Sequence, residues 1–459
     1  MKKREFLAMG GAVPLMLAGC GGSGSGSAPI RLVNASVGYP HLGFMVESTQ
    51  ATTDDVLYGG SSPFEIVQAG AVGLTLTVKN AANGNDSATS AQVRTVNKDS
   101  RYSLVAYGFA NELKQVLITE STVTPDAGKA NINVLNTSVD IGAVDVYLSA
   151  TKDLSVSTLI ASGIVGVSQS AFAGILAGSY FITVVGANSI AKGISDVRFQ
   201  TPTAIVLTAL EILTVILTPG ASGVLANAIL LTQGTAGAAT QPGNYLNTTA
   251  RLRAVTAVSG MSASVVGANN GSTVTVLASS ATPQYSNYFV VNTGTAPVVT
   301  VNGAAVPVLM DSTDATTGVT TSVAAVLAAG GDYTLMVYLN ASNAPTAKII
   351  EDNNTAPVTS SGVKFRLINL AANNQGLQLS MSVNSISIAS NISYASASAY
   401  TEISTPQSTN STAEVFNGAD SLISHTQVMT LPNIFTDIVV SIDPSTGVVK
   451  DFFRSASGT

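Results

Sequence analysis

Apolar and polar residues alternate along most of the chain, and the period of the alternation is two residues. Runs such as Leu74–Val78 and Thr273–Val276 place Val or Leu at every second position. Clusters of Asn, Gly, Ser and Pro interrupt these runs about every 8–12 residues, as they do between the short strands of a sandwich or barrel. A period of two with many β-branched residues is typical of strands, so the pattern predicts an all-β fold.

Three signatures recur in the same order along the chain, four times each. The first is a strand that opens each unit, with a weaker copy in the third unit: Ile30–Ala35, Ile132–Thr137, Arg251–Thr256 and Phe365–Leu370. The second is an aromatic residue ahead of a mid-unit strand: Phe64, Phe172, Phe289 and Tyr400. The third is a pair of strands that closes each unit, as in Tyr102–Tyr107 followed by Val116–Ile118. Signatures that recur in a fixed order indicate internal repeats.

The repeats predict four tandem domains, each about the size of one immunoglobulin-like β-sandwich. The expected boundaries are residues 29–126, 127–240, 241–356 and 360–459, and the third is the weakest match. Segments rich in Gly, Pro, Asn and Thr separate these units, as linkers do. We expect the four sandwiches to follow one another in a row.

The alignment of the repeats also predicts the secondary structure of two segments whose composition is misleading. Ala204–Thr218 is apolar enough to suggest a membrane segment or buried helix, but Glu211 interrupts it. It is also shorter than the roughly 20 residues that a spanning helix needs. The register predicts two strands around a turn near residues 209–211. Val323–Ala329 is rich in alanine, but the register predicts a strand there.

The opening strands, the Val144–Leu148 segment (VDVYL) and the segment that begins at Phe172 (FAGILAGSYFITVV) resemble a known bacterial repeat. It is the domain-of-unknown-function 4397 family of extracytoplasmic proteins. The resemblance extends over nearly all the chain after the N-terminal segment and is weakest in the third unit. It implies an immunoglobulin-like sandwich and a surface or envelope location. It implies no activity and brings no catalytic residues.

The N-terminal segment has the three zones of a secretory signal peptide. Lys2–Arg4 is basic and Phe6–Leu17 is apolar and uncharged, but it is too short to span a bilayer permanently. The closing residues resemble the lipobox of bacterial lipoproteins and are Leu17, Ala18, Gly19 and Cys20. In that family a peptidase cuts before the cysteine, whose sulfur carries lipid. We therefore expect a signal peptide at residues 1–19 and a lipidated Cys20 at the start of a flexible tether, residues 20–28.

Two alternatives remain open at this end of the chain. An ordinary signal peptide could precede a cysteine that is there by chance. Lys3–Leu7 also resembles a twin-arginine export signal with Lys in place of the first Arg, which leaves the export route open. Gly21 follows the cysteine where an Asp is the usual signal for retention in the inner membrane, so we expect the outer membrane if the source has one.

Charge and cysteine content narrow the classes of partner. The chain has a net charge of −6 with 10% charged residues, which offers no basic surface for nucleic acid. Cys20 is the only cysteine, so no disulfide can form within the chain. We expect the membrane to be reached through lipid on Cys20, and a partner to be an envelope protein or a glycan.

Few residues in this chain could carry catalysis or bind a metal. The two histidines, His41 and His425, are far apart in sequence, and no HExxH or Cys/His cluster occurs. No GxSxG nucleophile elbow supports a Ser-His-Asp triad. The paired carboxylates lie in or beside expected loops, where solvated turns are the better interpretation: Asp54-Asp55, Asp311 with Asp314, and Glu351-Asp352. We expect no catalytic residue, metal or cofactor.

Two features of the sequence give weaker indications of a binding site. Asn83–Ser87 is rich in oxygen atoms but has one carboxylate, so a turn is favoured over a calcium site. Tyr39, Tyr58 and Tyr285 lie outside the strongest signatures and are the better candidates for exposed glycan-stacking rings. We expect a non-enzymatic envelope lipoprotein of the adhesion or scaffold type. The alternatives are a glycan or small-ligand binding module and, last, a hydrolase.

Overall fold

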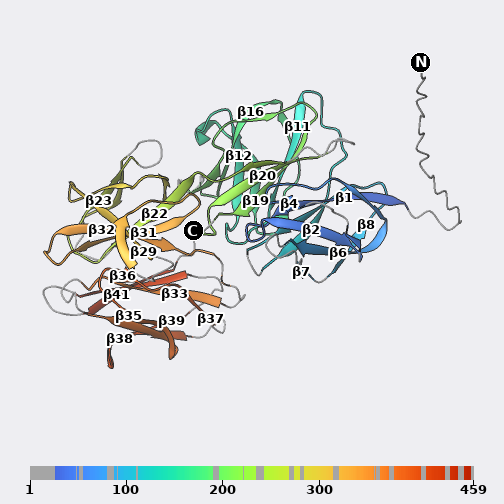
Figure 1. Cartoon of the computed structure of the whole chain (residues 1–459). Helices are drawn as coiled ribbons and strands as arrows, with labels where there is room; N and C mark the ends of the chain where they lie inside the picture. Colours follow the sequence, from blue (N-terminus) through green and yellow to red (C-terminus); the bar gives the residue numbers. More distant parts are fainter. Residues whose placement is uncertain are drawn as a thin grey trace, which may run out of the picture.

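The computed structural model contains eight β-sheets that form four sandwiches (Figure 1). It describes residues 26–455 with gaps at 48, 51–54, 80–86, 90, 110–111, 190–195, 221, 234–241, 268–272, 280–283, 314–319, 356, 358–361, 372–376, 405–409, 429–434 and 443–448. The expectation of an all-β fold is confirmed. The signal peptide, Cys20 and most of the tether lie outside the described residues.

The first sandwich consists of a sheet with strand order β10-β9-β1-β5 and a second sheet with order β3-β2-β6-β7, to which β4 and β8 add. A buried cluster that includes Leu32, Phe44 and Leu74 fills the space between the sheets. Its strands are β1 (Ser27–Ala35), β2 (His41–Val46), β3 (Thr49–Gln50), β4 (Val56–Leu57), β5 (Glu65–Gln68), β6 (Gly70–Val78), β7 (Ser87–Ala88), β8 (Gln92–Val96), β9 (Tyr102–Tyr107) and β10 (Lys114–Thr119).

The second sandwich has sheet orders β14-β11-β19-β20-β21, with β15 on β11, and β13-β12-β16-β17, with β18 on β16. A short 3₁₀ helix, Leu154–Val156, precedes β13. The strands are β11 (Lys129–Asn136), β12 (Val144–Ser149), β13 (Thr158–Ile164), β14 (Ser168–Gln169), β15 (Ala173–Leu176), β16 (Gly178–Gly186), β17 (Val197–Gln200), β18 (Ile205–Leu207), β19 (Ile212–Pro219), β20 (Ala226–Gln233) and β21 (Gly243–Tyr245).

The third sandwich has sheet orders β25-β22-β31-β32-β29-β30, with β26 on β22, and β24-β23-β27-β28. Its first sheet is extended because β29 pairs in parallel with β32. The strands are β22 (Thr249–Thr256), β23 (Ala263–Val266), β24 (Val274–Leu277), β25 (Gln284–Tyr285), β26 (Phe289–Asn292), β27 (Val298–Val301), β28 (Ala304–Val306), β29 (Val308–Thr313), β30 (Thr320–Ala324), β31 (Asp332–Leu339) and β32 (Pro345–Asp352).

The fourth sandwich has sheet orders β36-β33-β40-β41, with β37 on β33, and β35-β34-β38-β39. Its buried cluster includes Phe365, Leu379 and Met381. The strands are β33 (Gly362–Asn369), β34 (Leu379–Val383), β35 (Ile386–Ile392), β36 (Ser396–Ala397), β37 (Thr401–Ser404), β38 (Asn410–Asn417), β39 (Asp420–Val428), β40 (Phe435–Ile442) and β41 (Val449–Ser455).

Each sandwich begins with a strand that pairs in parallel with the first strand of its closing hairpin. The four parallel pairs are β1 with β9, β11 with β19, β22 with β31, and β33 with β40. In each case the next strand along the chain completes the hairpin antiparallel. The opening and closing signatures of the sequence therefore meet in one sheet, which we call the opening sheet of each repeat.

The prediction for one of the two misleading segments is confirmed, and the prediction for the other is only partly correct. Residues 204–218 form β18 and β19 around a turn at residues 209–210, so the predicted pair of strands is confirmed. The segment Val323–Ala329 is not helical, but β30 ends at Ala324 and residues 325–328 are irregular. The prediction of a strand over the whole segment is therefore wrong beyond Ala324. Ala325 and Leu327 are buried in the third core without strand pairing.

The four sandwiches are not a simple row, because they pack in two pairs through their opening sheets. A buried apolar cluster joins the first two repeats, with Val33 and Val105 on one side and Ile216 and Ile229 on the other. A second cluster joins the third and fourth repeats. Figure 1 shows this arrangement, with the third repeat (yellow to orange) against the fourth (orange to red). The expected row is corrected on this point.

The period of two explains how one strand serves both a core and a contact between repeats. In β1, Ile30 and Leu32 lie in the core of the first sandwich, whereas Val33 and Ala35 lie in the cluster between repeats. Successive side chains of a strand point to opposite faces, so a strand that is apolar at nearly every position is buried on both. None of the described residues forms a helix long and apolar enough to cross a membrane.

Candidate functional site

Two residues that recur in the repeats, a serine and an asparagine, make hydrogen bonds that stabilise the fold. A serine lies two residues before each mid-unit aromatic, and its hydroxyl accepts a hydrogen bond from the backbone N–H of the opening strand. The serines are Ser62, Ser170, Ser286 and Ser398. This spacing identifies Tyr288, not Phe289, as the mid-unit aromatic of the third repeat, which corrects the sequence assignment. The Ser-x-aromatic pattern is visible in the sequence and was missed there.

An asparagine at or next to the end of three of the opening strands ties loops together. The side-chain amide of Asn34 donates to the carbonyls of Tyr39 and Val56. Asn136 and Asn369 make the equivalent pairs of hydrogen bonds in their own repeats. Because each amide is buried and has backbone partners, these residues hold the fold and leave no group for a ligand.

A buried polar group lies at one equivalent position of every opening strand, on the face that contacts another repeat. The residues are Arg31, Asn133, Arg253 and Arg366, which lie opposite Ser103, Thr214, Thr334 and Asp437 in the parallel register. In the first repeat the Arg31 Nε donates to Ser103 and, over 2.8 Å, to Glu120. In the third, Arg253 donates to Thr334, which in turn donates to Asp352.

The second repeat has the same arrangement without charge. Thr214 donates to the Asn133 amide oxygen and accepts a hydrogen bond of 2.6 Å from Gln233. Asn133 thus replaces an arginine, and Gln233 replaces the carboxylate that the first and third repeats place at this point. Charge is lost at both positions together, which indicates that the two side chains depend on one another.

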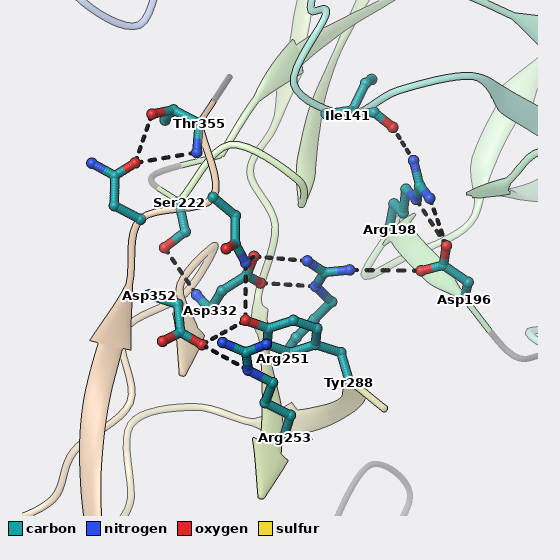
Figure 2. A network of polar contacts seen from close by, with 12 residues as sticks. Ile141, Asp196, Arg198, Ser222, Arg251, Arg253, Tyr288, Asp332, Asp352 and Thr355 are labelled. Carbon is teal, nitrogen blue, oxygen red and sulfur yellow. Dashed lines mark hydrogen bonds and ion pairs between the residues drawn. The ribbon is translucent and has the colours of Figure 1, made fainter. Parts of the chain in front are cut away.

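An extended polar network lies where the second, third and fourth repeats meet (Figure 2). Figure 2 shows the Arg251 guanidinium between two carboxylates, Asp332 and Asp196. Arg251 donates two hydrogen bonds of 2.8 and 2.7 Å to Asp332 in its own repeat. Asp196 belongs to the second repeat and also pairs with Arg198, which donates to the carbonyl of Ile141. The network therefore links the second repeat to the third through charged side chains.

Backbone contacts strengthen this junction. The Ser222 hydroxyl of the second repeat accepts a hydrogen bond of 2.9 Å from the backbone N–H of Asp332. The carbonyl of Ser222 accepts another from the N–H of Asn354, whose side-chain amide donates to Asp332 and Tyr288. The loop after β19 is thus bound from two sides by the third repeat.

Asp352 joins the third repeat to the fourth. Its Oδ2 accepts hydrogen bonds of 2.5 Å from Tyr288 and 2.6 Å from Thr334, and lies 3.5 Å from the Arg253 Nε. Its Oδ1 accepts one of 2.6 Å from Arg366, which belongs to β33. The Asp352 carboxylate is fully buried. A carboxylate with this many charge-assisted hydrogen bonds holds its partners in fixed positions.

The protonation of the network follows from burial and pairing. Burial raises the pKa of Tyr288 well above its ordinary value, so its hydroxyl stays protonated and donates to Asp352. Burial alone would raise the pKa of Asp196, but its pairs with Arg198 and Arg251 outweigh burial and lower that pKa. Burial would likewise lower the pKa of Arg251, and its pair with Asp332 reverses the direction. Asp196 and Arg251 are therefore both charged at neutral pH.

A pocket of about 390 Å³ opens beside Asp352. The second repeat contributes Ser222, the end of β32 contributes Glu351 and Asp352, and the fourth repeat contributes Arg366 and Tyr400. The Arg366 guanidinium lies 4.5 Å from the centroid of the Tyr400 ring. Of the carboxylate pairs that the sequence singled out, Glu351-Asp352 is the one beside this pocket, but adjacent residues of a strand project to opposite faces, and only Asp352 is buried.

The other residues singled out in the sequence do not form a site among the described residues. His41 lies 3.2 Å from Asp55 at an exposed position. Asp311 pairs with Lys348. The side chain of His425 and the residues Asp54, Asp314 and 83–86 lie outside what the structure describes. Among the described residues, no group of three or more His, Cys, Asp or Glu side chains is placed to hold a metal ion.

The three tyrosines expected to be exposed are partly buried instead, which corrects that expectation. Tyr39 packs against the first core. Tyr58 lies in the contact between the first two repeats, where its hydroxyl is 2.8 Å from that of Thr218. Tyr285 packs in the contact between the third and fourth repeats. The outer face of each opening sheet is covered by another repeat. The sequence positions of these tyrosines did not indicate this.

Residues 28–147 match the family described as "Domain of unknown function (DUF4397)". This segment belongs to the DUF4397 family. It covers the whole first repeat and the start of the second, up to the β12 strand. No curated protein matches the chain in sequence. Among solved structures, the chain is similar to one titled "The Bacillus anthracis TIE protein", at 9% identity and a TM-score of 0.14, with 91% of this chain and 68% of that chain covered.

Proposed function

We propose that this DUF4397-containing chain is a non-enzymatic lipoprotein of the cell envelope that serves as a scaffold or adhesion platform. One observation carries the proposal: the buried charges where the second, third and fourth repeats meet are paired with one another, both within the third repeat and across repeats. In an enzyme the corresponding groups would be aimed at a substrate. Here they stabilise the relative positions of sandwiches, as a protein that presents surfaces requires.

Anchoring rests on the N-terminal sequence. Cys20 is the sole thiol and follows Leu17-Ala18-Gly19, which matches the lipobox. Each buried CH₂ of an acyl chain contributes about 0.8 kcal/mol, so two or more chains hold a protein stably on a bilayer. With Gly21 after the cysteine, the outer membrane is the proposed destination in a bacterium with two membranes. The partner is an envelope protein or a glycan, and the acidic chain takes no nucleic acid.

Metabolic labelling with an alkyne fatty acid tests the anchor. We expect the wild-type chain to incorporate the label and Cys20→Ser to lose it. Ser23→Ala is the matched control in the same tether and should be labelled like the wild type. An unlabelled wild-type chain would contradict the lipoprotein assignment.

The non-enzymatic role has a separate test. Purified full-length chain in detergent is incubated with generic ester, glycoside and peptide substrates, and we expect no turnover above the buffer rate. Turnover that disappears in Asp352→Asn would place a reactive centre beside the pocket and overturn the scaffold proposal in favour of a hydrolase.

A further inference from the structure

A group of large apolar side chains is exposed at one end of the pair that the first two repeats form. We propose that they make up a bilayer-contact surface, which touches lipid directly and orients the chain on the membrane. The inference rests on the proposed lipidation of Cys20 and goes beyond it, because an anchor alone sets no orientation. The side chains and their exposed fractions are Val123 (70%), Leu176 (66%), Val206 (67%) and Leu210 (53%).

The opening strands of the first two repeats start at the same end of the pair. Near the start of β1, the Arg31 guanidinium donates over 3.0 Å to the carbonyl of Thr232, close to the end of β20. Near the other end of β1, the Tyr58 hydroxyl lies 2.8 Å from that of Thr218, close to the end of β19. The end of β20 pairs with the start of β19, and β19 runs parallel to β11. The strands β1 and β11 therefore point the same way.

Val123 and Leu210 lie at this common end. Val123 follows β10 in the linker, where the backbone N–H of Ser121 donates over 2.8 Å to Gln233, the last residue of β20. Leu210 lies in the turn before β19, and its N–H donates over 2.7 Å to the carbonyl of Lys129, the first residue of β11. The linker and the turn therefore bring their apolar side chains to the same end of the pair.

Leu176 and Val206 lie at this end of the second sandwich. Leu176 is the last residue of β15 and pairs with Lys129 at the start of β11. The next strand, β16, begins at Gly178, and Val206 pairs with Ser179 on that strand. Both side chains are therefore close to the turn that joins β15 to β16, on the same end as the start of β11.

The backbone of Leu210 is strained at a position that the core does not require. Its φ is 68°, in the left-handed region where leucine is rare and glycine is favoured. The side chain is more than half exposed, so burial does not compensate for the strain. A large apolar residue that persists in such a turn indicates a contact outside the protein.

The chain leaves the first sandwich toward Cys20 at this end as well. β1 begins at Ser27, and the carbonyl of Gly26 accepts a hydrogen bond from the N–H of Ala69. An extended chain covers at most about 3.3–3.6 Å per residue, so the six steps from Cys20 to Gly26 reach roughly 20 Å. Lipid on Cys20 therefore brings this end to the bilayer, where apolar side chains lie at the boundary between headgroups and acyl chains.

The opposite end of the second sandwich supplies a matched control. Val139 is 59% exposed and lies in the loop that follows β11, and Val165 and Val167 are exposed beside it. A strand rises about 3.3 Å per residue, so the eight residues of β11 separate Val139 from the bilayer-contact surface by roughly 25 Å. A probe at Val139 should remain in water when a probe at Val123 is in lipid.

The experiment places a fluorescent probe at each end. Cys20 is the only cysteine of the chain and lipidation consumes its thiol, so an introduced cysteine alone takes a thiol-reactive probe. Val123→Cys, Leu210→Cys and Val139→Cys are labelled after intact mass has verified lipid at Cys20, and are reconstituted into phosphatidylcholine vesicles with and without a nitroxide on the acyl chains. We expect the probes of Val123→Cys and Leu210→Cys to shift to shorter wavelength and to lose most of their emission to the nitroxide. The probe of Val139→Cys should do neither.

Two double variants separate apolar contact from mere proximity to the anchor. In the labelled Val123→Cys chain, Leu176→Asp with Leu210→Asp should restore most of the emission, because a carboxylate is costly to place in lipid. Val165→Asp with Val167→Asp makes the same change at the opposite end and should leave the quenching unchanged. The substituted positions are exposed, and circular dichroism checks that both variants keep the β fold.

Several outcomes would overturn the proposal. On a lipidated chain, equal emission from Val123→Cys and Val139→Cys in nitroxide vesicles would remove the orientation and leave the anchor intact. Quenching of Val123→Cys that survives Leu176→Asp with Leu210→Asp would mean that the anchor alone accounts for it. A shift to shorter wavelength without quenching would indicate that a second copy of the chain covers the surface. A wild-type chain without lipid would overturn the anchor and this surface together, and the mass measurement distinguishes that case.

Discussion

The contact between the first two repeats and the contact between the last two use the same face of the opening sheet but differ in the number of buried apolar side chains and in how their buried charges are paired. Nine buried apolar side chains form the first contact, whereas the buried apolar cluster of the second has four. Both contacts also hold buried charges, which are Arg31 with Glu120 in the first and Asp352 with Arg253 and Arg366 in the second. The ion pair of the first contact lies within one repeat, whereas the Asp352 carboxylate pairs with an arginine of each of two repeats.

Single substitutions should also destabilise the two contacts in different ways. An apolar contact loses free energy in proportion to the surface that a mutation removes from it. A buried ion pair loses most when one partner is removed, because the remaining charge is left without compensation in a poorly solvated place. Single substitutions in the two contacts can separate these cases.

The largest effect is expected for Asp352→Ala. The substitution leaves both Arg253 and Arg366 buried without their shared carboxylate, so we expect a loss of about 3–5 kcal/mol in the free energy of unfolding. Urea unfolding followed by tyrosine fluorescence measures it, since the chain has no tryptophan. Hydrogen exchange should show the loss of protection in β32 and β33.

Gln233→Ala is the matched control, because Gln233 takes the place of Asp352 in the second repeat and is neutral. Its loss should cost about 1–3 kcal/mol, as for a buried hydrogen-bonding group. If Asp352→Ala cost no more than Gln233→Ala, the distinction between a charged and a neutral residue at this position would be wrong.

A somewhat smaller effect is expected for Ile216→Ala in the apolar contact. Ile216 is fully buried between the first two repeats, and shortening it should cost about 2–5 kcal/mol through lost burial and a residual cavity. The loss should be the same in low and high salt, since no charge is involved. Val206→Ala, in an exposed position of the same repeat, is the control and should change the free energy of unfolding by less than about 0.5 kcal/mol. A loss for Ile216→Ala that depends strongly on salt would contradict an apolar contact.

The sequence predicted the all-β fold and the opening and closing strands because alternation and repetition are local signals. The sequence also indicated the contact between repeats less directly, because some strands are apolar on both faces. Val33 and Ala35 are as apolar as Ile30 and Leu32, so β1 has two buried faces, and only one of them can belong to its own core. Which repeat covers the second face depends on how the linkers turn, and no local pattern records that.

The candidate site was harder to predict for the same reason. Ser222, Asp352 and Tyr400 come from three repeats, and their distance in sequence hides their proximity. Glu351-Asp352 was noticed as a carboxylate pair, but its environment depends on Arg366 across a domain contact. The Arg-to-Asn and Glu-to-Gln replacements between repeats were visible once the register was known, and they could have indicated a buried pair.

The smallest net loss among these variants is expected for a double variant that makes the first repeat resemble the second. Glu120→Gln alone leaves Arg31 buried beside a neutral partner and should be strongly destabilising, by about 3–5 kcal/mol. Arg31→Asn with Glu120→Gln recreates the neutral Asn133–Gln233 arrangement. Arg31 also donates to the carbonyl of Thr232 in the second repeat and stacks on Phe64, so the double variant should still lose about 1–2 kcal/mol.

The double variant should therefore be more stable than Glu120→Gln, although it carries one more substitution. A double-mutant cycle by urea unfolding gives the coupling energy between the two positions, with Ser103 left unchanged. Additive losses would mean that Arg31 and Glu120 act independently, and that the paired replacement in the second repeat has no energetic basis. A favourable coupling would show that each opening sheet accepts either a complete ion pair or none, which is the difference between the first repeat and the second.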